Sequence, residues 1–84
     1  MRLTFKLYAS LSDYLPEEGK KTNALALDVA VGTTVNDLIA RFELPHALCH
    51  LVLIDGNFVP PGERAGRVLA EGETLAIWPP IAGG

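Results

Sequence analysis

Apolar and polar residues alternate in three stretches of the chain. In residues 2–8, Leu3, Phe5 and Leu7 fall on one side and the more polar residues on the other. This period of two is typical of a strand with one buried face. The same spacing predicts strands over 24–31 and 74–78. Their inward positions are Leu25, Leu27, Val29, Val31, Leu75 and Ile77.

Residues 35–42 show helical spacing instead. Their apolar positions follow the i, i+3, i+4, i+7 pattern, which is the signature of a helix with one buried face. Thr34 and Asp37 are placed as a capping pair at its start. We expect the helix to end near Leu44, because the following proline disfavours helical geometry in the residue before it. The apolar stripe consists of Val35, Leu38, Ile39 and Phe42.

A shorter helix is predicted between the first two strands. Leu11, Tyr14 and Leu15 are spaced as on a helix, with Ser10 as the expected N-cap. The next residues, 16–23, are polar and contain both proline and glycine. They are therefore predicted to form a solvated loop.

The second half of the chain contains short strands. An apolar run over 51–54 is followed by Asp55 and Gly56, a dipeptide typical of hairpin turns, and by a return strand around Phe58. The order of elements predicts an α+β fold, with one sheet covered by one main helix. Apolar residues on both faces of 51–54, together with Trp78, exceed what one helix covers. We therefore expect an apolar sheet surface that faces a protein partner, with Phe58 or Trp78 among its anchors.

Composition narrows the class of protein. The 84 residues suffice for one domain with one modest core. Seven Lys and Arg against ten Asp and Glu give a net charge of −3, without the basic stripe that nucleic-acid binding requires. The chain starts without the apolar stretch of a signal peptide, has a single cysteine and has no apolar run of membrane-spanning length. These features predict a cytoplasmic protein without membrane or nucleic-acid partners.

Few side chains in the sequence suggest catalysis. Cys49 and His50 are adjacent, so their side chains point apart on a strand and do not face each other on a helix. We therefore predict a buried, structural Cys49. His46 and His50 are four residues apart, which suits a metal pair on one helix face, yet no third ligand follows at a specific spacing. The sequence predicts no metal, no bound cofactor and no catalytic side chain of its own.

The end of the chain carries the distinctive motif. After Trp78, two prolines are followed by Ile-Ala and a terminal pair of glycines. This predicts a domain over 1–78 and a flexible tail over 79–84 that extends up to roughly 20 Å. Gly83 and Gly84 lack a Cβ and fit a narrow channel, so the tail presents its own α-carboxylate. An ionised carboxylate is a poor acyl donor and requires activation, for which adenylation by ATP is the common solution.

The order of elements and the ending Pro79-Pro80-Ile81-Ala82-Gly83-Gly84 resemble the MoaD/ThiS sulfur carriers, which are ubiquitin-like β-grasp proteins. The ending is most similar to that of the small subunit of molybdopterin synthase, whose usual motif is Phe-Pro-Pro-Val-Ala-Gly-Gly. Trp78 and Ile81 replace the Phe and the Val of that motif and keep the apolar bulk.

The resemblance implies that an ATP-dependent activating enzyme adenylates Gly84 and that a persulfide donor converts it to a thiocarboxylate. The sulfur then passes to an acceptor, which in the molybdopterin branch is a pterin precursor in the large synthase subunit. Carriers for thiamine thiazole or another sulfur-transfer pathway, and ubiquitin-like modifiers linked to lysine, share the Gly-Gly tail and remain alternatives. The reacting residue is Gly84, and the predicted partner-binding residues are Phe58, Trp78, Pro79, Pro80, Ile81, Ala82 and Gly83.

Overall fold

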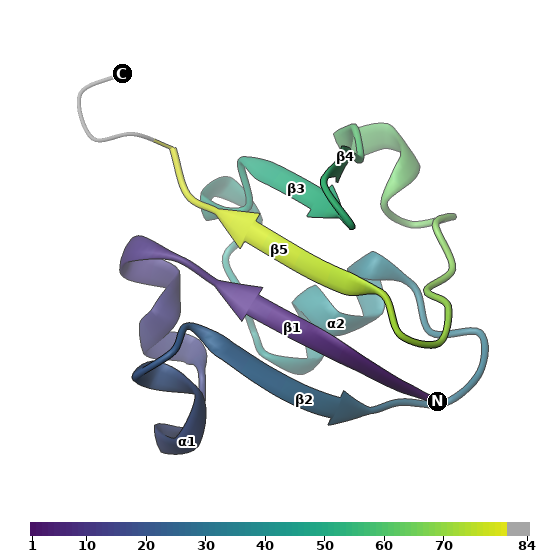
Figure 1. The fold of residues 1–84 in the computed structure, drawn as a ribbon. Coiled ribbons are helices and arrows are strands. Elements are labelled where there is room, and N and C mark those ends of the chain that lie inside the picture. The colour runs from purple at the N-terminus through teal and green to yellow at the C-terminus, as the bar shows by residue number, and fades with distance from the viewer. Residues whose placement is uncertain (81–84) are drawn as a thin grey trace.

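A mixed sheet with one main helix on one face organises the chain (Figure 1). The computed structural model describes residues 1–80. Within them the strand order is β2-β1-β5-β3-β4. The strands are β1 Arg2–Leu7, β2 Ala24–Asp28, β3 Leu51–Ile54, β4 Asn57–Phe58 and β5 Thr74–Trp78. The α-helices are α1 Glu17–Lys20 and α2 Val35–Arg41, and 3-10 turns span Ala9–Tyr14, His46–Leu48 and Pro61–Glu63. The predicted α+β arrangement is confirmed.

The first and last strands are neighbours at the centre of the sheet. Figure 1 shows β1 and β5 side by side with their arrowheads in the same direction, and the register pairs Phe5 with Leu75 and Leu7 with Ile77. β2 and β3 run antiparallel to these central strands on either side. The C-terminal ends of β1 and β5 therefore lie side by side, although the two strands are about seventy residues apart in sequence.

The start of α2 matches its sequence signal. Thr34 Oγ1 accepts a hydrogen bond from the Asp37 amide at 3.2 Å, and Asp37 Oδ2 accepts one from the Thr34 amide at 2.9 Å. This reciprocal capping box satisfies two amides that the first helical turn leaves without partners. The helix ends at Arg41, three residues before the predicted end, because Glu43 adopts a φ of +55° that helical geometry excludes.

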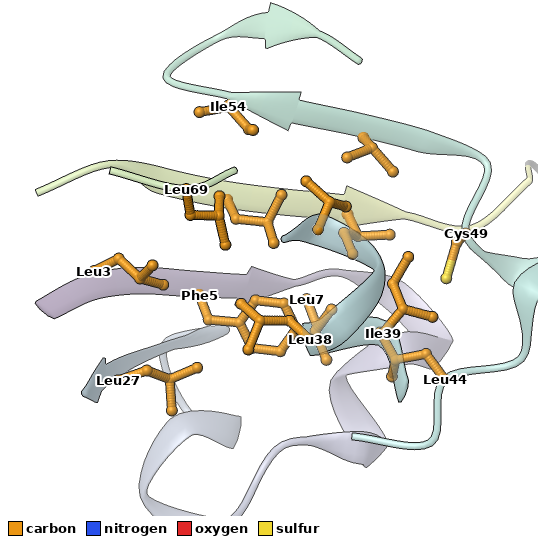
Figure 2. Close-up of a cluster of buried hydrophobic side chains, with 14 of the residues drawn as sticks. Leu3, Phe5, Leu7, Leu27, Leu38, Ile39, Leu44, Cys49, Ile54 and Leu69 are labelled. Carbon is orange, nitrogen blue, oxygen red and sulfur yellow. The ribbon is translucent and has the colours of Figure 1, made fainter. Parts of the chain in front are cut away.

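The core lies between α2 and the facing side of the sheet. Phe5 is fully buried and its ring lies 4.8 Å from that of Phe42, while Leu38 and Ile39 reach down from the helix (Figure 2). Each such side chain contributes roughly 1.5–3 kcal/mol of transfer free energy. The core therefore fixes which sheet face points inward and leaves the opposite face available.

The second strand is shorter than predicted. β2 ends at Asp28, which pairs with Arg2, and Val31 is 89% exposed instead of inward-facing. The chain turns away at Gly32, whose φ of +95° suits a residue without Cβ. Residues 29–31 continue the alternating pattern, although they lie beyond the last strand pair, in the turn that leads to α2.

The segment between β1 and β2 also departs from the prediction. The solvated loop predicted for 16–23 contains the short helix α1, and Gly19 within it is buried. A Cβ on Gly19 would lie 3.1 Å from the Ala24 carbonyl oxygen, so this position requires a close backbone approach. The preceding 3-10 turn does not use Ser10 as its N-cap; Ser12 instead donates its hydroxyl to the Ala9 carbonyl oxygen at 2.8 Å.

Candidate functional site

The junction between β5 and the C-terminal tail is held from both sides. On one side the His50 amide donates to the Trp78 carbonyl oxygen at 3.1 Å, and on the other the Tyr8 amide donates to the Ile77 carbonyl oxygen at 3.2 Å. Pro79 is partly buried and Pro80 is exposed. The predicted tail residues Ile81, Ala82, Gly83 and Gly84 lie outside the described residues.

Two aromatic rings stack at this junction. Trp78 lies on the sheet face opposite Ile77, and its ring is nearly parallel to that of Tyr8, with centroids 4.3 Å apart and planes 4° apart. Both side chains are partly buried. Stacked aromatic pairs contribute about 0.5–1.5 kcal/mol beyond their buried area. The Tyr8–Trp78 stack therefore stabilises the end of β5, where the chain leaves the sheet.

The face of the sheet opposite α2 carries a group of neighbouring apolar side chains, which we call the outer patch. The register places Leu51 opposite Trp78, and Leu53 opposite both Ala76 and Phe58. Paired positions share one face of a sheet. Phe58 is 55% exposed, which is high for a large aromatic side chain. The outer patch consists of Tyr8, Leu51, Leu53, Phe58, Ala76 and Trp78.

This arrangement confirms that apolar side chains occupy both faces of the sheet. The inward neighbours Val52 and Ile54 are buried, whereas Leu51 and Leu53 are only partly buried. Phe58 and Trp78, the predicted anchors, lie on the same face. The sequence prediction missed Tyr8, because its place beside Trp78 depends on the parallel pairing of β1 with β5.

A buried arginine forms hydrogen bonds to the backbone next to this junction. Arg64 is 6% exposed, and its guanidinium donates to the carbonyl oxygens of Cys49 at 2.7 Å, His50 at 3.2 Å and Val59 at 3.4 Å. Sequence reasoning missed this residue, because it lies in an irregular stretch without periodicity. By holding the backbone at 49–50, Arg64 fixes the amide that bonds Trp78.

Cys49 is a buried core residue, as predicted. It is 3% exposed, and its Sγ donates to the Pro45 carbonyl oxygen at 3.5 Å. Burial raises the pKa of the thiol, and the Arg64 charge offsets only part of this effect. A neutral, inaccessible thiol is a poor nucleophile. The nearby His46 starts a short 3-10 turn, and residues 1–80 contain no group of three or more His, Cys, Asp or Glu side chains that could hold a metal.

No helix within residues 1–80 is both long and apolar enough to cross a bilayer.

Comparisons with known proteins agree with this architecture. Residues 12–84 match the ThiS family. The search of curated proteins gave no match. Among solved structures, SAMP1 from Haloferax volcanii is 23% identical with a TM-score of 0.66, and each chain is covered completely. The HVO 2177 protein of that organism is also 23% identical, with a TM-score of 0.73, over 100% of this chain and 87% of the other.

A third similar structure comes from a complex. It is the complex of subunits 1 and 2 of molybdopterin-converting factor from Helicobacter pylori, with 12% identity, a TM-score of 0.60 and complete coverage of both chains. At these identities the structural similarities show the fold, which is the ubiquitin-like β-grasp that the resemblance implied.

Proposed function

The chain belongs to the ThiS family, and on that premise we propose that it carries sulfur as a thiocarboxylate on Gly84. The observation that supports this most directly is the position of the Gly-Gly ending. It follows, after two prolines, a strand end that His50 and Tyr8 hold in place beside the outer patch. A folded domain directly before the terminal carboxylate suits a protein that other enzymes bind and modify.

The proposed chemistry takes place at the α-carboxylate. One of its oxygens attacks the α-phosphorus of ATP and releases pyrophosphate, which leaves an acyl-adenylate. The terminal sulfur of a donor persulfide then displaces AMP, and a thiol cleaves the resulting S–S bond, is oxidised to a disulfide and releases the thiocarboxylate. In this proposal the activating enzyme binds the ATP and the chain itself binds no cofactor. The glycine carbonyl suits this attack because it has no side chain beside it.

We propose molybdopterin as the destination of the sulfur. The ending Pro79-Pro80-Ile81-Ala82-Gly83-Gly84 supports this assignment, as does the likeness to a chain solved in complex with subunit 2 of molybdopterin-converting factor. The large synthase subunit would then receive the tail and hold the pterin precursor. Conjugation to protein lysines is the second candidate, favoured by the likeness to small archaeal modifier protein 1 of H. volcanii, which is 22% identical with a TM-score of 0.63 over 95% of this chain and 98% of the other. A thiazole or other sulfur-transfer pathway is the third, in keeping with the family match.

Mass spectrometry of the C-terminal peptide tests the first step. The purified chain is incubated with its activating enzyme, ATP and a sulfur donor, and one oxygen of the peptide should be replaced by sulfur. A variant without Gly84 is the control: it should fold normally by circular dichroism and remain uncharged. An unmodified carboxylate, under conditions that charge an established carrier, would refute the proposal.

The acceptor is tested with the charged chain. Mixing it with the large synthase subunit and the pterin precursor should return the carboxylate form and a sulfur-containing pterin. Sulfur transfer to a thiazole synthase instead, or stable lysine adducts in cell extracts, would assign the chain to one of the alternatives.

We also propose that the outer patch docks the partner enzymes, with Phe58 and Trp78 as anchors. Truncating an aromatic anchor at an interface centre typically costs 2 kcal/mol or more. Trp78→Ala and Phe58→Ala should therefore each weaken binding to the activating enzyme, measured by calorimetry, by at least about tenfold. Val31→Ala removes an 89% exposed apolar side chain elsewhere and is the matched control. If Trp78→Ala and Phe58→Ala bind the activating enzyme as tightly as Val31→Ala and the wild type, the tail alone carries recognition.

A further inference from the structure

One charged side chain lies among the small residues beside the outer patch. Lys6 points away from α2, since its neighbours Phe5 and Leu7 are buried. The register places it between Ala24 of β2 and Ala76 of β5. Lys6 is itself partly buried, which is typical of a lysine whose methylene stem lies along a surface while its ammonium stays in water.

Within residues 1–80, three of the six other Lys and Arg side chains form ion pairs. Arg2 shares its sheet face but pairs with Asp28 at 3.0 Å, at the end of the sheet away from the tail. Arg67 pairs with Glu73. Among residues 1–80, Lys6 forms no ion pair. An unpaired cation at the border of the outer patch is notable in a chain of net charge −3.

Lys6 is also close to the tail. Neighbouring strands are about 4.8 Å apart and each residue rises about 3.3 Å, so the Lys6 Cα lies within roughly 8 Å of the Trp78 Cα. A protein that covers the Tyr8–Trp78 stack therefore also covers the ammonium. Burying that charge without a partner is strongly unfavourable, whereas an opposing carboxylate recovers much of this cost.

We propose that Lys6 is a specificity-determining residue, which selects an activating enzyme with a carboxylate in the middle of an otherwise apolar docking surface. This inference rests on the proposed function. The activating enzyme is the occupant, because adenylation of Gly84 precedes every acceptor considered above. An apolar surface without the carboxylate would be rejected by the unpaired ammonium, while the net negative charge of the chain disfavours general attraction to acidic proteins.

The test is ATP–pyrophosphate exchange by the activating enzyme at varied concentrations of the full chain. Lys6→Glu should raise KM at least about tenfold, and Lys6→Met, which keeps the apolar stem, should raise it less. Lys6→Arg should restore a KM close to the wild-type value. The value of kcat should not change, because the proposed Lys6–carboxylate contact acts on docking of the chain and takes no part in the reaction at Gly84.

Lys21→Glu is the matched control, since it makes the same charge change at an exposed residue outside the sheet. Its KM should equal that of the wild type. If the wild-type chain is adenylated and Lys6→Glu shares its KM, the role of Lys6 is refuted while the proposed function stands. If Lys21→Glu raises KM as much as Lys6→Glu, net charge determines the interaction and the proposal is also refuted. A wild-type chain that supports no exchange would overturn both proposals.

Discussion

Replacing Arg64 by methionine should destabilise the domain more than any surface substitution. The guanidinium is buried and donates to three backbone carbonyl oxygens, those of Cys49, His50 and Val59. Methionine fills similar apolar volume but donates no hydrogen bond. The substitution therefore leaves two buried carbonyl groups, those of Cys49 and Val59, and the partly buried carbonyl group of His50 without this donor.

The size of the effect follows from these contacts. A buried acceptor that loses its donor costs about 1–2 kcal/mol, which gives about 2–4 kcal/mol for Cys49 and Val59, and the partly buried bond to His50 adds less. Removing a buried positive charge recovers part of this cost. We therefore expect Arg64→Met to lower the free energy of unfolding by about 2–3 kcal/mol. In a domain of this size such a loss lowers Tm by roughly 10–20 °C.

Urea unfolding followed by circular dichroism measures this loss. Arg41→Met is the matched control, because Arg41 is exposed and its guanidinium lies over the face of the Phe42 ring, 5.6 Å from its centroid. Arg41→Met should lower the free energy of unfolding by less than about 1 kcal/mol. Arg64→Lys should retain only part of the stability, because a single ammonium does not reproduce the guanidinium fork. A loss below about 0.5 kcal/mol for Arg64→Met would refute the account of the three carbonyl bonds.

Three further substitutions test other parts of the structure. The hydrogen bond from Arg67 lowers the pKa of Glu73, so its stabilisation is present above the ordinary Glu pKa of about 4.3 and is lost as the pH falls towards the lowered value. Glu73→Gln should cost about 1 kcal/mol at pH 7 in urea unfolding, and a difference that persists undiminished at pH 3 would contradict this. Cys49→Ala should retain thiocarboxylate formation, and the native thiol should react with a thiol reagent at least about a hundredfold more slowly than in urea; fast labelling of folded protein would disprove its burial. Ala9 has a φ of +51°, so Ala9→Gly should stabilise the domain by about 0.5–1 kcal/mol, and a loss of stability would show that the residue is unstrained.

The elements that could be predicted from sequence are those whose signals are local. The capping pair of Thr34 and Asp37 and the alternation of Leu3, Phe5 and Leu7 need no knowledge of distant residues. The hairpin at Asp55 was also predictable, because the turn type demands a left-handed residue there and Asp55 has a φ of +50°. Local preference and tertiary structure agree at these positions.

The features that could not be predicted depend on pairing across the chain. Tyr8 becomes part of the outer patch only because β1 lies parallel to β5, and Lys6 stands between two alanines because β1 pairs with both β2 and β5. Arg64 has no periodic signal, since its role is set by carbonyl groups that the folded loop brings to it. Val31 shows the converse error, where alternation continued past the last residue that had a strand partner.

The two prolines after Trp78 explain why the strand ends where it does. The amides of His50 and Tyr8 bond the last carbonyl groups of β5, so the ladder is complete up to Trp78. A proline has no amide hydrogen and cannot extend a ladder inside a sheet, so β5 has no means of continuing between β1 and β3. The Tyr8–Trp78 stack and the hydrogen bonds of the buried Arg64 stabilise the sheet around Trp78, the last residue of β5. Stability is thus concentrated directly before the segment that the proposed chemistry must leave free, and changes at 79–80 should alter charging of Gly84 without altering the fold.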